Sequence, residues 1–528
     1  MSKFRWAILF AVILCGAPAF SAEPDFPQSE LVVNISASFP DMRPHLAYNA
    51  DEAQVMTAMY EGLFVYDPYN LDPVPGIAES WTESQDGLEW TFTIRRNARF
   101  SNGDFITART VRDSWLNLLR PSVNAPYASL LDCIEGAADY RTGKTSDPAA
   151  VGIRADSTYK LTVKLAMPAQ HLPKILCHHA FSAVHPSNFK AATETKKGPG
   201  FKPVSSGPFS IDSVSDTEIY FVKNPYYWDK EQVYLPGIRV IIDNDAESLT
   251  ARFNRGEIQW LAGAMLLNRI LDISSIQIAP MFSTEYLFFR TTWGPWQNPK
   301  IREALLLAVP WTRLREDYLI PATTLVFPIV GYPEVPGINT EDMEKAKALI
   351  AENLPPEISV PPLVIYVPES EYYFGLAEKL KPAWEELGFE IEVRSRPYTE
   401  YYATLRKDDY TLGVTSWIGD FADPLAFLEM FRPASSLNDS GWKNTTFEKY
   451  ITDAASRKTA KERYELLADA EKVLLKDSVI LPLSHNPSVN VIDREGLAGW
   501  YANALDIHPF KFMYFIQRPP LPGVVLAY

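Results

Sequence analysis

The chain has 528 residues, of which 47% are hydrophobic and 13% are aromatic. This length is too great for a single hydrophobic core and predicts two or three lobes. The chain carries 50 basic and 65 acidic residues, a formal net charge of −15 at pH 7. That balance argues against nucleic-acid binding, which needs a basic face.

The first 22 residues are predicted to be a secretory signal peptide. Lys3 and Arg5 precede the apolar run 6–15, and small residues follow at 17–21. The run is too short for a membrane span, and no later stretch is long and apolar enough. We therefore expect an exported, periplasmic protein. A lipid anchor on Cys15 is the alternative, although Leu14 stands where lipoprotein signals carry a small residue.

The mature chain contains two cysteines, Cys133 and Cys177. Export to an oxidising compartment makes a disulfide between them one expectation. Two free buried thiols are the other expectation, because a chain of this size does not need a covalent crosslink.

The N-terminal part alternates between strand and helix signals. A strand is expected at 31–35, and Asp51 is expected to cap a helix that carries Val55 and Met59. Apolar and polar residues alternate at 90–95 and at 159–165, which predicts two strands. Between them, Thr107 is expected to cap a helix.

The C-terminal part alternates more regularly between the residue patterns of strands and of helices. A strand and a helix stopped by Gly256 are expected within 237–260, a strand at 286–290, and a helix opened by Asn298-Pro299. Strands are then expected at 363–367, 391–393 and 410–416, with helices between them. This alternation predicts a parallel sheet with crossover helices.

A carboxylate, Asp420, follows the last of these strands in the stretch Trp417-Ile418-Gly419-Asp420-Phe421-Ala422-Asp423-Pro424. The ends of strands in open α/β sheets are common ligand sites. A glycine beside an aromatic residue lets a backbone approach a ligand while the ring walls a pocket. The alternative is that Asp420 or Asp423 only caps the helix predicted from Leu425 onward.

An ordered set of short motifs resembles the family-5 extracytoplasmic solute-binding proteins, the oligopeptide- and dipeptide-binding group. The resemblance runs from about Leu31 to the C-terminus. It includes the W-x-x-D-x-x-x-P pattern of residues 417–424. The other motifs are Glu61-Gly62-Leu63, Ala78-Glu79-Ser80-Trp81, Trp90-Thr91-Phe92-Thr93-Ile94-Arg95, Phe100-Ser101-Asn102-Gly103-Asp104, Ser206-Gly207-Pro208-Phe209 and Asn224-Pro225-Tyr226-Tyr227-Trp228.

This resemblance implies an α/β, bilobal periplasmic-binding-protein fold of the class II type, with an extra inserted domain and lobes joined by a hinge. Lobe I would comprise 23–60, 196–280 and 487–528. The inserted domain II would comprise 61–195, and lobe II (domain III) would comprise 281–486. The ligand would lie between the lobes.

The resemblance also implies a set of ligand-binding residues. Asp420 would receive the α-amino group of a peptide, beside Trp417, Ile418 and Gly419. Four further positions match family residues near the ligand, namely Arg406, Tyr127, Tyr48 and His485. The chain departs from the oligopeptide binders at Val414, where they carry an arginine, and near Phe289, where they carry an acid. Peptide length and carboxylate recognition are therefore left open.

A metal site is the second candidate. Four of the seven histidines fall between 171 and 185, close to Cys177. Imidazole and thiolate suit transition metals, but the spacing matches no standard zinc pattern. If 176–179 forms a strand, His178 and His179 point to opposite faces, as on an ordinary half-buried strand. Some members of the family carry nickel or metal complexes, so His178, His179 and His185 stay as candidates.

No G-x-S-x-G, H-E-x-x-H or P-loop motif occurs, so no enzymatic activity is expected. The sequence predicts the substrate-binding component of an ABC transporter that captures small peptides and delivers them to a membrane permease. The alternative is a binding protein for a metal ion or metal chelate in the same fold. We expect no cofactor, no nucleic-acid partner and a monomer.

Overall fold

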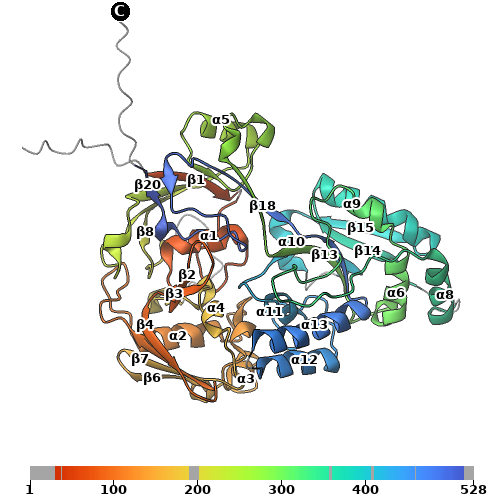
Figure 1. The fold of residues 1–528 in the computed structure, drawn as a ribbon, viewed down its shortest axis with the longest axis horizontal. Coiled ribbons are helices and arrows are strands. Elements are labelled where there is room, and N and C mark those ends of the chain that lie inside the picture. Colours follow the sequence, from red (N-terminus) through yellow and green to blue (C-terminus); the bar gives the residue numbers. More distant parts are fainter. Residues whose placement is uncertain are drawn as a thin grey trace, which may run out of the picture.

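The computed structural model describes residues 30–36, 38–189, 201–355, 360–405, 409–457 and 459–516 (Figure 1). The predicted signal peptide, Cys15 and Arg406 lie outside the described residues. In the described ranges, no helix is both long and apolar enough to cross a membrane. The chain has the predicted bilobal α/β fold, built on a seven-stranded, a five-stranded and a four-stranded sheet.

The seven-stranded sheet draws its strands from three separate parts of the chain. Leu31 and Val33 are fully buried, which explains why the predicted first strand forms. β1 runs parallel to β10 and β11, and the other pairs are antiparallel. In spatial order the strands are β12 (Ile276–Pro280), β18 (Pro487–Ile492), β11 (Trp260–Leu261), β1 (Leu31–Ser36), β10 (Gly237–Ile242), β9 (Glu218–Lys223) and β8 (Phe209–Val214).

The four-stranded sheet lies on the same side of the molecule as the seven-stranded sheet in Figure 1. Trp90, Phe92 and Ile94 are buried on one face, as their alternation predicted. All its pairs are antiparallel, in the order β4 (Ala78–Glu83), β5 (Glu89–Ile94), β7 (Lys160–Lys164) and β6 (Ile153–Ser157). Two small sheets pair β2 (Phe64–Tyr66) with β3 (Pro73–Pro75) and β19 (Leu497–Ala498) with β20 (Tyr514–Phe515).

The five-stranded sheet differs from the predicted parallel sheet in the direction of one strand. Its order is β15 (Ile391–Arg396), β14 (Leu363–Pro368), β16 (Leu412–Ile418), β13 (Ser283–Phe289) and β17 (Ile480–Ser484). β14 runs parallel to β15 and β16, as predicted. β13, however, is antiparallel to both β16 and β17, so the sheet is mixed. The reason is that β13 follows β12 and β17 leads into β18, so each is joined at one end directly to a strand of the seven-stranded sheet.

Two chain segments cross side by side between the large sheets. β12 leads into β13 through Met281 and Phe282, and β17 leads into β18 through His485 and Asn486. β12 pairs with β18, and β13 pairs with β17. The hydroxyl of Ser283 donates to the carbonyl of Asn486 at 2.9 Å, which ties the two crossings together. The lobes are therefore joined by two strands.

Helices surround the sheets, and their starts follow capping rules. Thr107 and Asn298 cap α2 and α6 as predicted. Asp51 does not cap α1, because Asn49 occupies the cap and the Glu52 carboxylate accepts from its backbone N–H at 3.1 Å. The α-helices are α1 (Ala50–Met59), α2 (Ala108–Leu118), α3 (Ala137–Arg141), α4 (Leu172–Ile175), α5 (Ala246–Asn254), α6 (Pro299–Leu307), α7 (Trp311–Arg315), α8 (Met343–Asn353), α9 (Glu371–Glu386), α10 (Tyr398–Thr404), α11 (Leu425–Leu428), α12 (Thr445–Ala455) and α13 (Ala460–Lys476).

The histidine-containing segment 171–185 is not a strand. It contains α4 and one short 3-10 turn, η3 (His179–Phe181), which His178 precedes. A second such turn, η4 (Pro186–Asn188), begins directly after it. The path of the segment is set by α2, because the indole N–H of Trp115 donates to the carbonyl of Phe181 at 2.8 Å. Ser114 accepts from the backbone N–H of Val184 at 2.9 Å.

The two cysteines are free thiols, so the expected disulfide is not formed. Each thiol donates to a carbonyl of its own segment, Cys133 to Leu130 and Cys177 to Pro173. Burial raises the pKa of the Cys133 thiol to about 12, and it also raises the pKa of Cys177. Both thiols are therefore protonated and unreactive near neutral pH.

We expect Trp115→Phe to destabilise the fold by roughly 1–3 kcal/mol, because it leaves the buried carbonyl of Phe181 without its donor. Urea unfolding of the variant would measure the loss. Trp81→Phe is the matched control, since Trp81 is 37% exposed and should change stability by less than about 0.5 kcal/mol. Equal losses in the two variants would contradict this account of the 171–185 segment.

Candidate functional site

A cavity of about 1050 Å³ lies between the seven-stranded and the five-stranded sheets. Its wall is formed by α1, the segment 60–66, the loop 124–127, the segment 177–182, the region around Trp260, the start of α10, the end of β16 and the segment 505–511. This volume is at the upper end of the roughly 300–1,000 Å³ that small-molecule sites occupy. The cavity can therefore hold a ligand larger than a single amino acid.

Asp420 lies in this wall directly after β16. Gly419 precedes it and fits closely against Phe282, because a Cβ atom at Gly419 would come within 2.6 Å of that ring. The backbone N–H of Gly419 donates to the carbonyl of Phe282 at 2.9 Å. The turn is thus fixed from the crossing segment, and it directs Asp420 into the cavity wall.

The Asp420 carboxylate is buried without a charged partner. The residue is 8% exposed, and its Oδ2 atom has no hydrogen-bond partner in the described part of the chain. Oδ1 lies 3.9 Å from Nε2 of His178, which is beyond hydrogen-bond distance. Burial raises the pKa of Asp420 well above its usual range, because water no longer solvates the charge. A cation placed against Oδ2 would relieve this penalty.

His178 does not supply that cation. Its Nδ1 accepts from the backbone N–H of Ala180 at 3.3 Å, so the neutral ring carries its proton on Nε2, toward Asp420. Burial, together with the neighbouring ring of His179, lowers the pKa of His178 well below its usual range. The imidazole is therefore neutral, and it lines the cavity as a polar group.

Aromatic rings form the wall next to Asp420. The ring of Tyr48 lies 6.2 Å from Trp417, 5.9 Å from Tyr127 and 6.0 Å from Tyr402. The indole N–H of Trp417 donates to the carbonyl of Ala426 at 3.1 Å, which fixes its ring. Tyr66 donates its hydroxyl to the carbonyl of Asp420 at 3.0 Å.

Asp423 has a different role from Asp420. Its carboxylate accepts from the backbone N–H of Leu425 at 3.0 Å and from the guanidinium of Arg463 at 2.8 Å. Burial alone would raise the pKa of Asp423, but the Arg463 guanidinium lowers it below its usual value. Neither acid is the N-cap residue of α11, which is Pro424. Asp423 bonds to the first backbone N–H of α11 and to Arg463, which leaves Asp420 available to a ligand.

The structure brings together Asp420, Trp417, Ile418, Gly419, Tyr127 and Tyr48, since all six line the cavity. His485 is elsewhere: it is not in the cavity wall, and its ring contacts Thr284 Oγ1 at 3.0 Å and the carbonyl of Ser283 at 3.1 Å. The loop position of His485 in the sequence did not show that it follows β17 at the crossing between the lobes.

The histidine candidates do not form a metal site. His178 and His179 line the cavity, with ring centroids 4.1 Å apart. His185 is instead paired with Asp104, at 2.9 Å. No group of three or more histidine, cysteine, aspartate or glutamate side chains in the described ranges could hold a metal ion.

Other wall residues were not anticipated from the sequence, among them Tyr66, Tyr398, Tyr402 and Lys511. They come from segments far apart in the chain, so no local motif unites them. One signal was available: three tyrosines, at 398, 401 and 402, follow directly after the predicted strand at 391–393.

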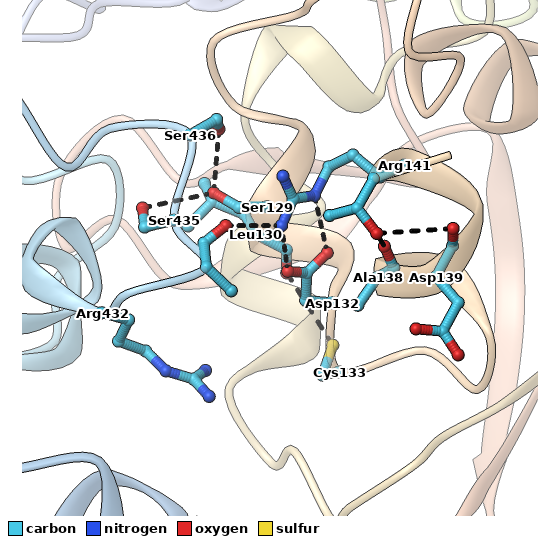
Figure 2. A network of polar contacts seen from close by, with 12 residues as sticks. Ser129, Leu130, Asp132, Cys133, Ala138, Asp139, Arg141, Arg432, Ser435 and Ser436 are labelled. Atoms are coloured by element: carbon cyan, nitrogen blue, oxygen red, sulfur yellow. Dashed lines mark hydrogen bonds and ion pairs between the residues drawn. The ribbon is translucent and has the colours of Figure 1, made fainter. Parts of the chain in front are cut away.

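Contacts beside the cavity hold the part with the four-stranded sheet against the lobe with the five-stranded sheet (Figure 2). Ser129 and Ser436 contact each other through their hydroxyls at 3.0 Å. Arg141 donates to the carbonyl of Ala434 at 2.7 Å and is held by Asp132 at 2.9 Å. Both parts of the chain therefore enclose the cavity.

We expect Asp420→Asn to stabilise the ligand-free protein at neutral pH. The unfolded pKa of aspartate is about 3.9, and the folded pKa of Asp420 is higher, so the folded state binds more protons between these values. Wild-type stability is therefore lost as pH rises through this window, and the asparagine variant avoids the loss.

Thermal unfolding at pH 4.5 and pH 8 would measure this effect after bound ligand has been removed by denaturation and refolding. The variant should gain at least about 1 kcal/mol at pH 8, and less at pH 4.5. A variant that is less stable than wild type at pH 8 would contradict the assignment of an unpaired buried carboxylate.

Comparisons with known proteins agree with this architecture. Residues 72–439 match the family model of bacterial extracellular solute-binding proteins, family 5. The oligopeptide-binding protein OppA of Bacillus subtilis is 28% identical, over 91% of this chain and 94% of its own. The murein tripeptide-binding protein MppA of Escherichia coli has a similar structure, with a TM-score of 0.82 and 24% identity, covering 93% of this chain and 99% of its own. A structure of MppA in its unliganded open form gives a TM-score of 0.64 and 25% identity, covering 93% of this chain and 98% of its own. The chain belongs to the family-5 bacterial extracellular solute-binding proteins.

Proposed function

We propose that this protein is the substrate-binding component of an ABC importer, which captures small peptides between its lobes and delivers them to a membrane permease. Its relatives include proteins named as oligopeptide- and dipeptide-binding. The observation that carries the proposal is the buried Asp420 carboxylate, with one unpartnered oxygen, in the wall of a large cavity.

The α-amino group of a peptide fits this carboxylate. An ammonium group would bring a full positive charge and three hydrogen-bond donors to Oδ2 of Asp420. Charge-assisted hydrogen bonds of this kind are about twice as strong as neutral ones. The rings of Trp417, Tyr48 and Tyr127 exclude water around Asp420, which strengthens the attraction further.

The end of β16 offers backbone groups for the rest of the peptide. β14 pairs with β16 only at Leu412 and Gly413, so residues 415–418 continue beyond β14. Ser416, Trp417 and Ile418 also line the cavity. A peptide that lies along this segment as an added strand would be recognised through its backbone and not through its side chains. This mode suits a protein that accepts many peptide sequences.

Closure of the lobes around the ligand is the second part of the proposal. Tyr66 reaches Asp420, Lys174 donates to the carbonyl of Ala422 at 3.1 Å, and Arg141 reaches Ala434. The lower TM-score to the open MppA form supports a closed arrangement in this structure. The paired crossings at 281–282 and 485–486 would serve as the hinge. A ligand that touches both lobes would favour closure.

We propose that lobe I comprises residues 23–60, 196–280 and 487–528, domain II residues 61–195, and lobe II residues 281–486. The protein is exported by its signal peptide and acts in the periplasm as a monomer, and Cys15 is the position of a lipid anchor if one is present. It binds its ligand without catalysis. The metal alternative is less favoured, since His185 lies away from His178 and His179.

We expect Asp420→Asn to weaken the binding of an unblocked tripeptide at least 100-fold, because the variant loses the charge that pairs with the amine. N-acetylation of the peptide should weaken wild-type binding to a similar extent. Isothermal titration calorimetry on both proteins with both peptides would measure the coupling. If acetylation and Asp420→Asn weaken binding additively, the amine does not contact Asp420.

Native mass spectrometry of protein purified without refolding would separate the peptide and metal alternatives. We expect a set of added masses that correspond to short peptides, because a closed cavity releases its ligand slowly. The Asp420→Asn variant should lose these masses. A single added mass of a metal ion or metal chelate would contradict the proposal.

A further inference from the structure

We infer that a latch between domain II and lobe II sets how tightly the closed protein retains any peptide. This inference rests on the proposed function, in which peptides bind between the lobes and closure encloses them. It adds positioning residues that hold the lobes together without contacting the ligand. The latch consists of Ser129, Asp132 and Arg141 of domain II and Ala434 and Ser436 of lobe II.

The chain path lets domain II separate from lobe II. Residues 61–195 follow α1 and lead into β8, and residues of both elements belong to the core of the seven-stranded sheet. The five-stranded sheet is joined to that same sheet through the crossings at 281–282 and 485–486. Contacts between domain II and lobe II are therefore noncovalent, and a hinge motion at the crossings would form or break them. In Figure 1, α3 and α12 lie at the lower edge of the molecule, whereas β13 and β18 lie above them.

Arg141 at the end of α3 is the first part of the latch. Its Nε donates to Oδ1 of Asp132 at 2.9 Å and its Nη2 donates to Oδ2 at 2.5 Å, so two parallel bonds fix the guanidinium. The same Nη2 donates to the carbonyl of Ala434 in lobe II at 2.7 Å (Figure 2). Because Asp132 belongs to domain II, Arg141 is oriented before the lobes close and needs no reordering to reach Ala434.

A pair of serine hydroxyls is the second part of the latch. Ser436 donates to the carbonyl of Pro126 at 2.5 Å, so its oxygen is left to accept from the hydroxyl of Ser129 at 3.0 Å. Ser129 lies in the turn η1 (Ala128–Leu131), which follows Tyr127 directly. Pro126 and Tyr127 line the cavity, so this part of the latch is continuous with the cavity wall.

The lobe II side of the latch is fixed within its own loop. The side-chain amide of Asn438 donates to the carbonyls of Arg432 at 3.2 Å and Trp442 at 3.0 Å, one on each side of Ala434 and Ser436 in the chain. Arg432 is itself paired with Glu448 at 3.2 Å. Because each side of the latch is ordered separately, closure forms it at a low cost in conformational entropy.

The latch acts on closure and not on the ligand itself. Its five residues lie outside the wall of the large cavity. Ser129 instead lines a second cavity of about 40 Å³, together with Leu130 of domain II and Phe421 and Leu425 of lobe II. That cavity has room for only about one to three water molecules and not for a peptide.

Asp420 and the latch have opposite effects on an empty closed protein. Closure without a ligand buries the unpartnered carboxylate of Asp420, which opposes it. The amine of a peptide removes that penalty, and the latch then adds the same stabilisation whatever the side chains of the peptide. The measured affinity depends on the stability of the closed state, so the latch contributes equally to the affinity for every peptide.

Two variants weaken the latch from its two sides. Arg141→Gln keeps a donor for Asp132 but is too short to bridge Asp132 and Ala434, and Ser436→Ala removes the donor to Pro126. Titration calorimetry on the full protein would use the tripeptides Ala-Ala-Ala, Ala-Phe-Ala and Ala-Lys-Ala. Arg141→Gln should weaken the binding of all three by the same factor, at least about fivefold, and Ser436→Ala by roughly two- to fivefold. Stopped-flow tryptophan fluorescence should place the loss in the dissociation rate, because the latch forms after the ligand has entered.

Arg154→Gln is the matched control, since it removes the same charge from an exposed position on β6 in the same domain. Arg154 pairs with Asp156 within its own sheet and lies outside the latch. Its affinities should stay within about twofold of wild type. Ser436 belongs to lobe II, so a loss of affinity in Ser436→Ala cannot arise from damage to the fold of domain II.

Unchanged affinities in both latch variants would overturn this inference while leaving the proposed function intact. Losses that differ severalfold among the three peptides would also overturn it, because the latch residues would then contact the ligand. An equal loss in Arg154→Gln would assign the effect to overall charge and overturn the latch. If none of the three peptides binds to wild-type protein, the proposed function fails and this inference fails with it.

Discussion

Burying a carboxylate without a partner costs several kcal/mol of folding free energy, and Asp420 is buried in this way. The rest of the site follows from that placement. Gly419 is required because no side chain fits against Phe282, and His178 is kept neutral by burial, so neither supplies a compensating charge. Asp423, three residues later, shows the ordinary solution, an ion pair with Arg463. The contrast between these two acids supports the proposal that Asp420 serves the ligand, whereas Asp423 stabilises the fold.

The architecture explains how one ligand can contact both lobes. β16 delivers Asp420 from the five-stranded sheet, while Tyr66 and His178 come from the part of the chain that holds the four-stranded sheet. The two crossing strands are the shared connection between the large sheets. Because a cation at Asp420 would be enclosed from both sides, binding and closure would be coupled through the same few contacts.

Local sequence rules predicted much of this fold. Strands around Trp90 and at 363–367, and the caps at Thr107 and Asn298, depend on side-chain alternation and on short-range hydrogen bonds, and they are confirmed. The strand-to-helix turn containing Asp420 was predicted for the same reason. Differences arose where distant segments decide the outcome: the direction of β13 and the position of His485 depend on where the chain crosses between lobes. The tyrosines of the cavity wall were also not predicted, since a cavity has no sequence signature.

The central claim is that Asp420 binds the amine of a peptide. A crystal structure of the protein with a bound tripeptide tests it most directly. The account predicts the ligand's amino nitrogen about 2.7–3.2 Å from Oδ2 of Asp420, with the chain of the peptide continuing along residues 416–418. A peptide whose amine lies elsewhere, with Oδ2 of Asp420 still unpartnered or hydrated, would contradict the claim.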